Sequence, residues 1–154
     1  MKIKPSRKSR FTLIELLVVI GIIGILTGIL LPAIAGSMKE GKKTKAKSVC
    51  RQIAVAVEAY LNDYGSLPKT DNGTDSTAAN ITDNSLLTIL GGSNARSKVY
   101  FENTGTVSHP FGGIYYIVMD GNYDNSITAN GETVAGSVAV YTTCDGDTVV
   151  SWER

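Results

Sequence analysis

The sequence FTLIELLVVIGIIGILTGILLPAIAGSM, residues 11–38, decides the fold of this chain. It is apolar almost throughout, and no charged residue lies between Leu16 and Met38. About 20 apolar residues suffice to cross a bilayer as a helix. The one carboxylate of the stretch is Glu15, and a charge within a membrane segment costs about 3 kcal/mol and usually has a partner. The stretch therefore predicts a membrane-spanning helix in which Glu15 has a specific role.

Charged residues are distributed unevenly between the first 64 residues, which include this stretch, and the rest of the chain. Residues 1–64 carry eleven Lys or Arg and four Asp or Glu, whereas residues 65–154 carry four and ten. The leader, residues 1–10, is basic, but the far flank at residues 39–47 is basic too, so charge counting alone does not fix the orientation. We expect a cytoplasmic N-terminus, because the leader emerges first and usually dominates. The acidic head argues against nucleic-acid binding, because phosphate contacts need Lys and Arg. It is compatible with binding a hard cation such as calcium.

The apolar run also allows two simpler interpretations that give Glu15 no special role. A secretory signal could be cleaved after Ala33-Ile34-Ala35, but the run is longer than the usual 7–15 apolar residues and contains Glu15. A simple signal anchor would leave the Glu15 carboxylate without a function. Both interpretations are therefore less economical than one that uses Glu15.

The hexapeptide F-T-L-I-E-L at 11–16, followed by the apolar run, resembles the N-terminus of type IV pilins and type II secretion pseudopilins. The resemblance implies that a prepilin peptidase cuts between Arg10 and Phe11 and N-methylates Phe11. It also implies that Glu15 pairs with the Phe11 amine of a neighbouring subunit as helices pack into a filament. Arg10 departs from the family pattern, which has Gly before the cut. Pro32 lacks an N–H and is expected to kink the helix.

The segment 39–64 continues the helix with an amphipathic pattern. Val49, Ile53 and Tyr60 recur at helical spacing, so we expect one helix from about Phe11 to Tyr64. Its lysine-rich start contacts either lipid headgroups or the acidic heads of neighbouring subunits. The ending YLNDYGSLP, residues 60–68, places Gly and Pro where helices stop and resembles the same point in the major pseudopilin.

The head, residues 65–154, is expected to hold a small antiparallel sheet of three or four strands. Thr70 to Asn80 should form an irregular loop, and Asp83 to Gly92 a short helix capped by Asp83 or Asn84. The predicted strands cover residues 98–102, 113–120, 137–143 and 148–152. The fold class is therefore α+β and pilin-like, with the long helix packed on the sheet.

An acidic loop, DGNYDNSITANGE at 120–132, carries oxygen side chains at every second position. This spacing can surround one calcium ion, and the predicted ligands are Asp120, Asn122, Asp124, Ser126 and Thr128. Asp145 and Asp147, from a neighbouring turn, are weaker candidates. The alternative is a hairpin turn rich in Asn, Asp and Gly that needs no metal. Major pseudopilins carry a calcium site in a β–β loop, so the resemblance favours the metal.

No constellation of catalytic residues is evident, and an enzyme is not expected. The single histidine, His109, lies in HPFGGIYY at 109–116, which resembles the D-P-W-G-x-x-Y turn of pseudopilins, and it is interpreted as a turn residue. The two cysteines, Cys50 and Cys144, could form one disulfide or remain unpaired.

The resemblance implies a single-pass inner-membrane protein with a periplasmic head. It would polymerise with itself and work with a prepilin peptidase, minor pseudopilins and an inner-membrane assembly platform in type II secretion. Two alternatives stay open. One is a surface type IV pilin for adhesion, motility or DNA uptake, and the other is a membrane-anchored calcium or ligand-binding module that never polymerises.

Overall fold

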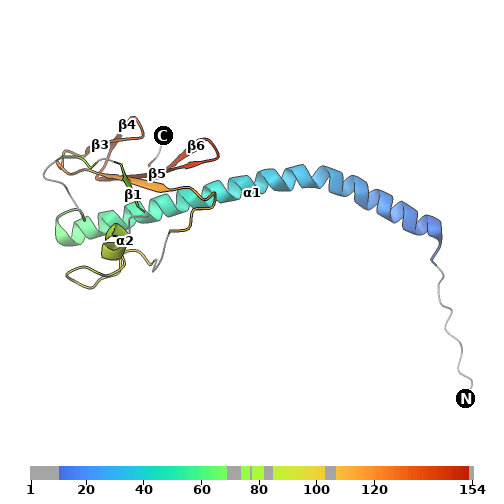
Figure 1. Cartoon of the computed structure of the whole chain (residues 1–154), viewed down its shortest axis with the longest axis horizontal. Coiled ribbons are helices and arrows are strands. Elements are labelled where there is room, and N and C mark those ends of the chain that lie inside the picture. The colour runs from blue at the N-terminus through green and yellow to red at the C-terminus, as the bar shows by residue number, and fades with distance from the viewer. Residues whose placement is uncertain (1–10, 69–73, 77, 82–84, 103–106, 153–154) are drawn as a thin grey trace, which may run out of the picture. The chain divides into compact units, whose positions relative to one another are not determined.

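The computed structural model describes residues 11–68, 74–76, 78–81, 85–102 and 107–152 (Figure 1). The chain divides into two compact units, residues 1–40 and 41–154. The predicted basic leader, which includes Arg10, lies outside the described residues.

Helix α1, Leu13–Tyr64, is the longest element of the chain and contains 52 residues. It begins two residues after the predicted start at Phe11 and ends where YGSLP predicted. Gly65 lies at φ +68° and donates its N–H to the Leu61 carbonyl at 2.7 Å, which closes the last turn. Pro32 lies inside the helix without ending it, and the kink expected there stays a prediction.

Within the first unit, the part of α1 before Glu40 is helical and covered by nothing. Its large hydrophobic side chains are between 46% and 82% exposed. Among the described residues, α1 is the one helix long and apolar enough to cross a membrane. An apolar helix without a protein cover needs lipid or other helices around it.

The second unit contains the predicted antiparallel sheet. Four strands lie in the order β1-β2-β5-β6, and each pairs with its neighbours in antiparallel fashion. They are β1 (Ala79–Asn80), β2 (Tyr115–Met119), β5 (Val138–Cys144) and β6 (Asp147–Val150). The short β1 was not predicted, because its two residues belong to the polar stretch that was expected to form an irregular loop. The α+β fold class with a long helix on a small sheet is confirmed.

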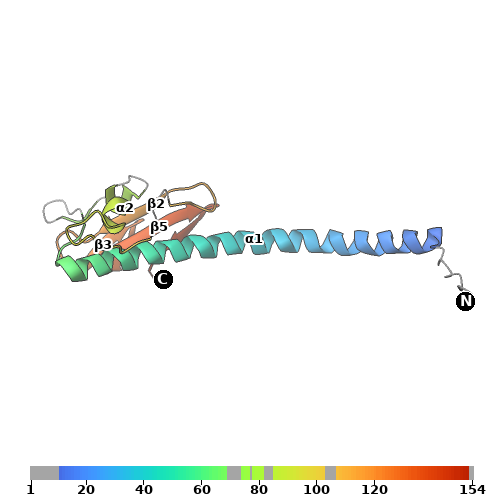
Figure 2. The same cartoon turned by 90° about the horizontal axis from the view of Figure 1, so that it is seen from below.

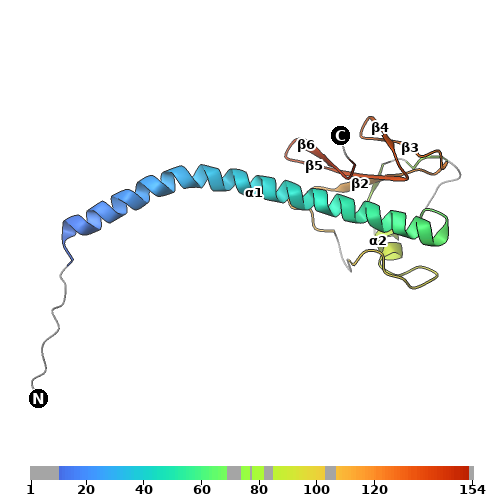
Figure 3. The same cartoon turned by 180° about the vertical axis from the view of Figure 1, so that it is seen from behind.

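The core of the second unit lies between α1 and the sheet. Cys50, Ile53 and Val57 from one face of α1 are fully buried together with Tyr115 and Val140 from the sheet. Figure 2 shows β2 and β5 alongside this half of the helix, and Figure 3 gives the same arrangement from behind. The amphipathic face predicted for residues 39–64 is thus the face that the sheet covers.

Short helix α2, Ser85–Leu90, lies within the predicted range. Its predicted caps, Asp83 and Asn84, lie outside the described residues. The helix is followed by Gly91, whose N–H donates to the Leu87 carbonyl at 2.8 Å.

The prediction of a strand at residues 98–102 is wrong, because the structure has no strand there. The backbone N–H groups of Tyr100 and Phe101 both donate to the carbonyl of Leu90, at 2.8 and 3.1 Å, instead of to a strand. This segment is therefore tied to the end of α2, and Phe101 is buried in the core. Its apolar residues reflect packing against helices rather than membership of the sheet.

A second, two-stranded sheet begins within the stretch predicted as the acidic loop and includes its second half. Strands β3 (Ser126–Ala129) and β4 (Glu132–Ala135) pair in antiparallel fashion around the turn Asn130-Gly131. Both turn residues have positive φ, 52° and 79°, as a two-residue type I′ hairpin requires. The hairpin buries Ile127 and Val134 in a cluster with Val118 of β2. Residues 126–135 therefore form a hairpin, and calcium binding by the preceding loop stays a prediction.

Candidate functional site

The start of α1 is built as a capping box. Thr12 precedes the helix, and the Glu15 backbone N–H donates to its Oγ1 at 3.3 Å. In return, Glu15 Oε2 accepts hydrogen bonds from the Thr12 N–H at 2.8 Å and from the Thr12 hydroxyl at 2.7 Å. This reciprocal pattern satisfies donors that a helix start leaves open, and the positive end of the helix dipole favours the carboxylate there.

The capping box gives Glu15 a role within one chain. The T-x-x-E spacing at 12–15 is a sequence signal for such a box, and sequence reasoning focused on pairing between subunits missed it. Phe11, the predicted new N-terminus, directly precedes the box and is 81% exposed. The predicted processing and assembly residues that the structure describes therefore stand together at one exposed helix end.

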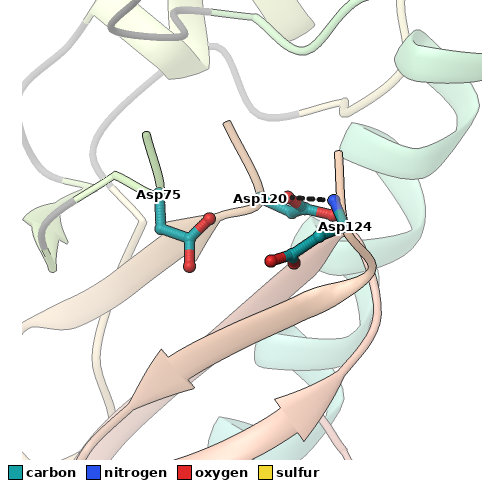
Figure 4. A group of neighbouring side chains, drawn as sticks. All are labelled: Asp75, Asp120 and Asp124. Carbon is teal, nitrogen blue, oxygen red and sulfur yellow. Dashed lines mark hydrogen bonds between the residues drawn. The ribbon is translucent and has the colours of Figure 1, made fainter. Parts of the chain in front are cut away.

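The second candidate site is a group of three aspartates in the head. One carboxylate oxygen from each of Asp75, Asp120 and Asp124 lies within 4.8 Å of the others (Figure 4). Asp120 directly follows β2 and is 3% exposed, whereas Asp75 lies in the segment before β1. Three carboxylates this close repel one another unless a cation or protons lie between them.

Backbone donors hold Asp120 and Asp124 in place. The two carboxylate oxygens of Asp120 accept from the N–H groups of Asp124 and Asn125, at 3.3 and 2.7 Å. Asp124 in turn accepts from the Ser126 N–H at 2.8 Å. Asn122 Oδ1 accepts from the Asp124 N–H at 2.9 Å, so it supports the turn. The loop is thus shaped around its acidic side chains before any ligand is considered.

Asp75 reaches this site through a close contact between two backbone segments. The Ser76 N–H donates to the Met119 carbonyl at 2.9 Å, and the Met119 N–H donates to Ser76 Oγ at 2.7 Å. A Cβ on Gly121 would lie 1.9 Å from the Thr74 carbonyl oxygen, so only glycine allows this approach. Sequence reasoning missed Asp75, because nothing local to residue 75 signals contact with a strand some 45 positions later.

One oxygen of Asp75 is buried and unsatisfied. Among the described residues, Asp75 Oδ1 has no hydrogen-bond partner although water does not reach it. Such an atom costs roughly 1–3 kcal/mol, and more when charged. A hard cation between the three carboxylates would satisfy this oxygen, so the residues present fit a calcium ion.

The structure does not gather all of the predicted ligands. Ser126 and Thr128 belong to strand β3, where side chains follow the strand instead of curling around a point. Asp145 and Asp147 lie at the β5–β6 turn, whereas the three aspartates lie near Val138, at the other end of β5. The two ends of β5, Val138 and Cys144, are six residue steps apart, which corresponds to about 20 Å along a strand. Asp147 there forms an ion pair with Lys43 of α1.

His109 holds the turn before β2, as predicted. Its Nδ1 accepts hydrogen bonds from the N–H groups of Phe111 and Gly113, at 3.1 and 2.8 Å. Nδ1 is therefore unprotonated, and the proton of the neutral ring lies on Nε2, 2.9 Å from Thr142 Oγ1. Burial lowers the pKa of His109, in keeping with a neutral, structural ring.

The two cysteines lie in the core as free thiols. Cys50 and Cys144 are both fully buried, and neither forms a disulfide. Burial raises the pKa of Cys50 to about 12, so its reactive thiolate is scarcely populated at neutral pH. Of the two alternatives given by the sequence, the structure therefore shows unpaired cysteines, which pack as small buried residues.

Comparisons with known proteins agree with the resemblance drawn from the sequence. The chain is 35% identical over 78 residues to the type II secretion system core protein G of Pseudomonas aeruginosa, covering 51% of this chain and 55% of that protein. It is 36% identical over 72 residues to the core protein G of Aeromonas hydrophila, covering 47% and 50%. The fimbrial protein EcpC of Eikenella corrodens is 35% identical over 98 residues, covering 62% and 63%.

The chain thus spans about half the length of the core G proteins it matches. No protein-family model matches the chain, and no solved structure does. The predicted resemblance to type II secretion pseudopilins is confirmed by these relatives, whereas cleavage before Phe11 stays a prediction.

Proposed function

We propose that this chain is a structural subunit of a type II secretion pseudopilus, which polymerises through its N-terminal helix to help drive protein export across the outer membrane. One observation carries the proposal. The large apolar side chains in the first half of α1 are exposed, and the same helix continues into the half that forms part of the core of the head. A subunit that leaves lipid for a filament needs such a helix, because neighbouring helices replace the lipid around it.

Maturation would take place at the N-terminal end of α1. A prepilin peptidase would cut between Arg10 and Phe11 and N-methylate Phe11. Before assembly the capping box satisfies the Glu15 carboxylate within its own chain, and in the filament Glu15 would pair with the Phe11 amine of a neighbour. The subunit would span the inner membrane once, with its head in the periplasm, next to minor pseudopilins and an assembly platform.

Processing gives the first test. In cells that contain a type II secretion system and its prepilin peptidase, the mature chain should begin at N-methylated Phe11, and sheared fractions should contain its polymers. Mass spectrometry of the intact chain reads the new N-terminus directly. A mature chain that still begins at Met1, or that begins at Gly36 after a signal-type cleavage, would contradict the proposal.

Calcium binding by the head belongs to the same proposal. Asp75, Asp120 and Asp124 would hold the ion, which would offset their mutual repulsion and satisfy the buried Asp75 oxygen. Bound calcium would join the segment before β1 to the loop after β2 and so stabilise the head. This is a structural role, and no catalytic step is assigned to it.

Titration calorimetry of the full chain in detergent tests this calcium site. Binding at or below millimolar calcium is expected, together with a calcium-dependent rise in Tm. Asp75→Asn should weaken binding at least about tenfold, because one ligand charge is lost. Gly121→Ala should do the same by pushing Asp75 away, whereas Gly41→Ala, in open space on α1, should leave binding unchanged. Wild-type protein that binds no calcium would contradict the site.

A surface pilin remains the second candidate, and the similarity to a fimbrial protein over 62% of the chain favours it. The two functions differ in what loss of the gene removes. Loss of a pseudopilus subunit abolishes export of folded proteins, whereas loss of a surface pilin removes long surface fibres and leaves export intact.

A further inference from the structure

A groove on the head lies beside the core face of α1. It has a volume of about 740 Å³ and is lined by α1 residues between Thr44 and Ala59 and by the segment 98–102. Both walls belong to the second unit of the chain. The apolar residues Val55 and Val99 line it, and they are 63% and 52% exposed.

Large exposed apolar side chains are few in the described part of the head, and half of them line this groove. Among the described residues between Gly41 and Trp152, the exposed large hydrophobic side chains are Val55, Val99, Ile114 and Tyr123. Two of the four line the groove. Exposed apolar side chains gathered in a concave surface indicate a binding site.

The rim of the groove on α1 is basic, and the opposite wall carries one acidic residue, Glu102. Lys47 and Arg51 are exposed and stand one turn apart on α1, an arrangement that is unfavourable for like charges. Within the described residues, neither side chain forms an ion pair, whereas Lys98 on the opposite wall is paired with Asp63. The rim therefore selects an acidic partner with an apolar or aromatic anchor.

The head itself has an acidic loop with an exposed aromatic side chain. Tyr123 is 52% exposed and stands beside the exposed Asp124 in the loop after β2. Tyr123 is held at φ +60°, unusual for a bulky residue, and its hydroxyl accepts a hydrogen bond from the Leu67 N–H at 3.2 Å. A rigid exposed tyrosine makes a good interface anchor, and an Arg side chain can stack on its ring.

We propose that the groove of one copy receives the Tyr123 loop, residues 120–125, of a second copy. Tyr123 would lie on Val55 and Val99, with its ring against Arg51, and the acidic loop as a whole would face Lys47. The groove and the loop are different surfaces of the chain, so the contact is heterologous and its repetition builds an open polymer. The inference rests on the proposed filament function and assigns the contact between heads, separate from the packing of the N-terminal helices.

Cysteine cross-linking in assembled polymers tests the contact. The double variant Val55→Cys with Tyr123→Cys should give a ladder of covalent multimers after mild oxidation, seen on a non-reducing gel. Each single variant should give no ladder, and the native cysteines are fully buried and should not contribute. A double variant that forms polymers without a ladder overturns the inference and leaves the filament function intact.

A charge reversal gives an independent measurement. Arg51→Glu should lower the polymer fraction about tenfold, because the rim would then repel the acidic loop. Asn62→Glu adds a carboxylate to the same helix outside the groove and should leave the polymer fraction unchanged. Normal polymer from Arg51→Glu, or cross-linking of Val55→Cys to a different protein, overturns the inference. If the wild-type chain forms no polymer, the proposed function fails and this contact fails with it.

Discussion

Single residues decide the chemistry of this protein, and Glu15 is the clearest case. Its carboxylate accepts two hydrogen bonds from Thr12, so it is satisfied within one chain while α1 stands alone. In the proposed filament the same oxygen atoms would also be within reach of an amine at the exposed helix end. The residue therefore suits both the membrane-stored subunit and the assembled one.

His109 makes the stability of the head depend on pH. Its pKa is lowered by burial in the folded state, whereas the unfolded value is about 6.5. Below pH 6.5 the unfolded chain therefore binds a proton that the folded head resists, and stability falls as pH falls from there toward the lowered pKa. Above pH 6.5 this contribution is complete.

Thermal unfolding of the full chain between pH 5 and 8 checks this dependence. His109→Asn keeps an acceptor for the turn but cannot titrate, so Tm should fall less between pH 7 and 5 than in the wild type. At pH 7 the variant should be less stable by about 1 kcal/mol, because the bond to Thr142 is lost. Parallel Tm curves for the two proteins would show that His109 does not carry the effect.

At the level of elements, the β3–β4 hairpin shows why Ser126 and Thr128 lie on a strand where the sequence predicted a loop. Ligand positions i, i+2 and i+4 in a calcium loop have the same period as side chains on one face of a strand. The sequence from Asp120 to Thr128 therefore fits both structures equally well. The outcome depends on burial of Ile127 and Val134 against the main sheet, which no local pattern reveals.

The turn of this hairpin gives a stability prediction. Gly131 lies at φ +79° with open space around it, so Gly131→Ala meets backbone strain alone and should destabilise the head by about 1 kcal/mol. Gly41→Ala, on α1 and equally unobstructed, should be neutral or slightly stabilising. Chemical denaturation of both variants measures the difference. Equal stabilities would argue against the left-handed turn.

Across the whole molecule, long periodic features were predictable and contacts between distant segments were not. The apolar run, the stripe around Ile53 and the stop at Gly65 predict α1 almost to the residue. Of the three aspartates that lie together in the head, the sequence singled out two. Asp120 and Asp124 are local to one loop, whereas Asp75 arrives only because its segment pairs beside Met119. The fully buried Tyr115 and Cys50 likewise meet through packing alone.

The two units divide the work of the proposed subunit. Residues 11–40 supply the apolar helix that lipid or neighbouring helices must cover, and residues 41–154 supply a head with its own core. The acidic residues are concentrated in the second unit, since all Asp and Glu residues except Glu15 and Glu40 lie there. In the proposed filament, assembly by the helix and contact between heads would be separate, so each should be open to disruption alone.

The polymer yield of a Glu15 variant tests the central claim most directly. Glu15→Ala should be processed and inserted like the wild type but should lose nearly all of its sheared polymer, because the buried Phe11 amine of a neighbour would have no counter-charge. Glu15→Asp, which keeps the charge, should retain part of the yield. Wild-type polymer yield from Glu15→Ala, measured by quantitative immunoblot of the sheared fraction, would contradict assembly through this residue.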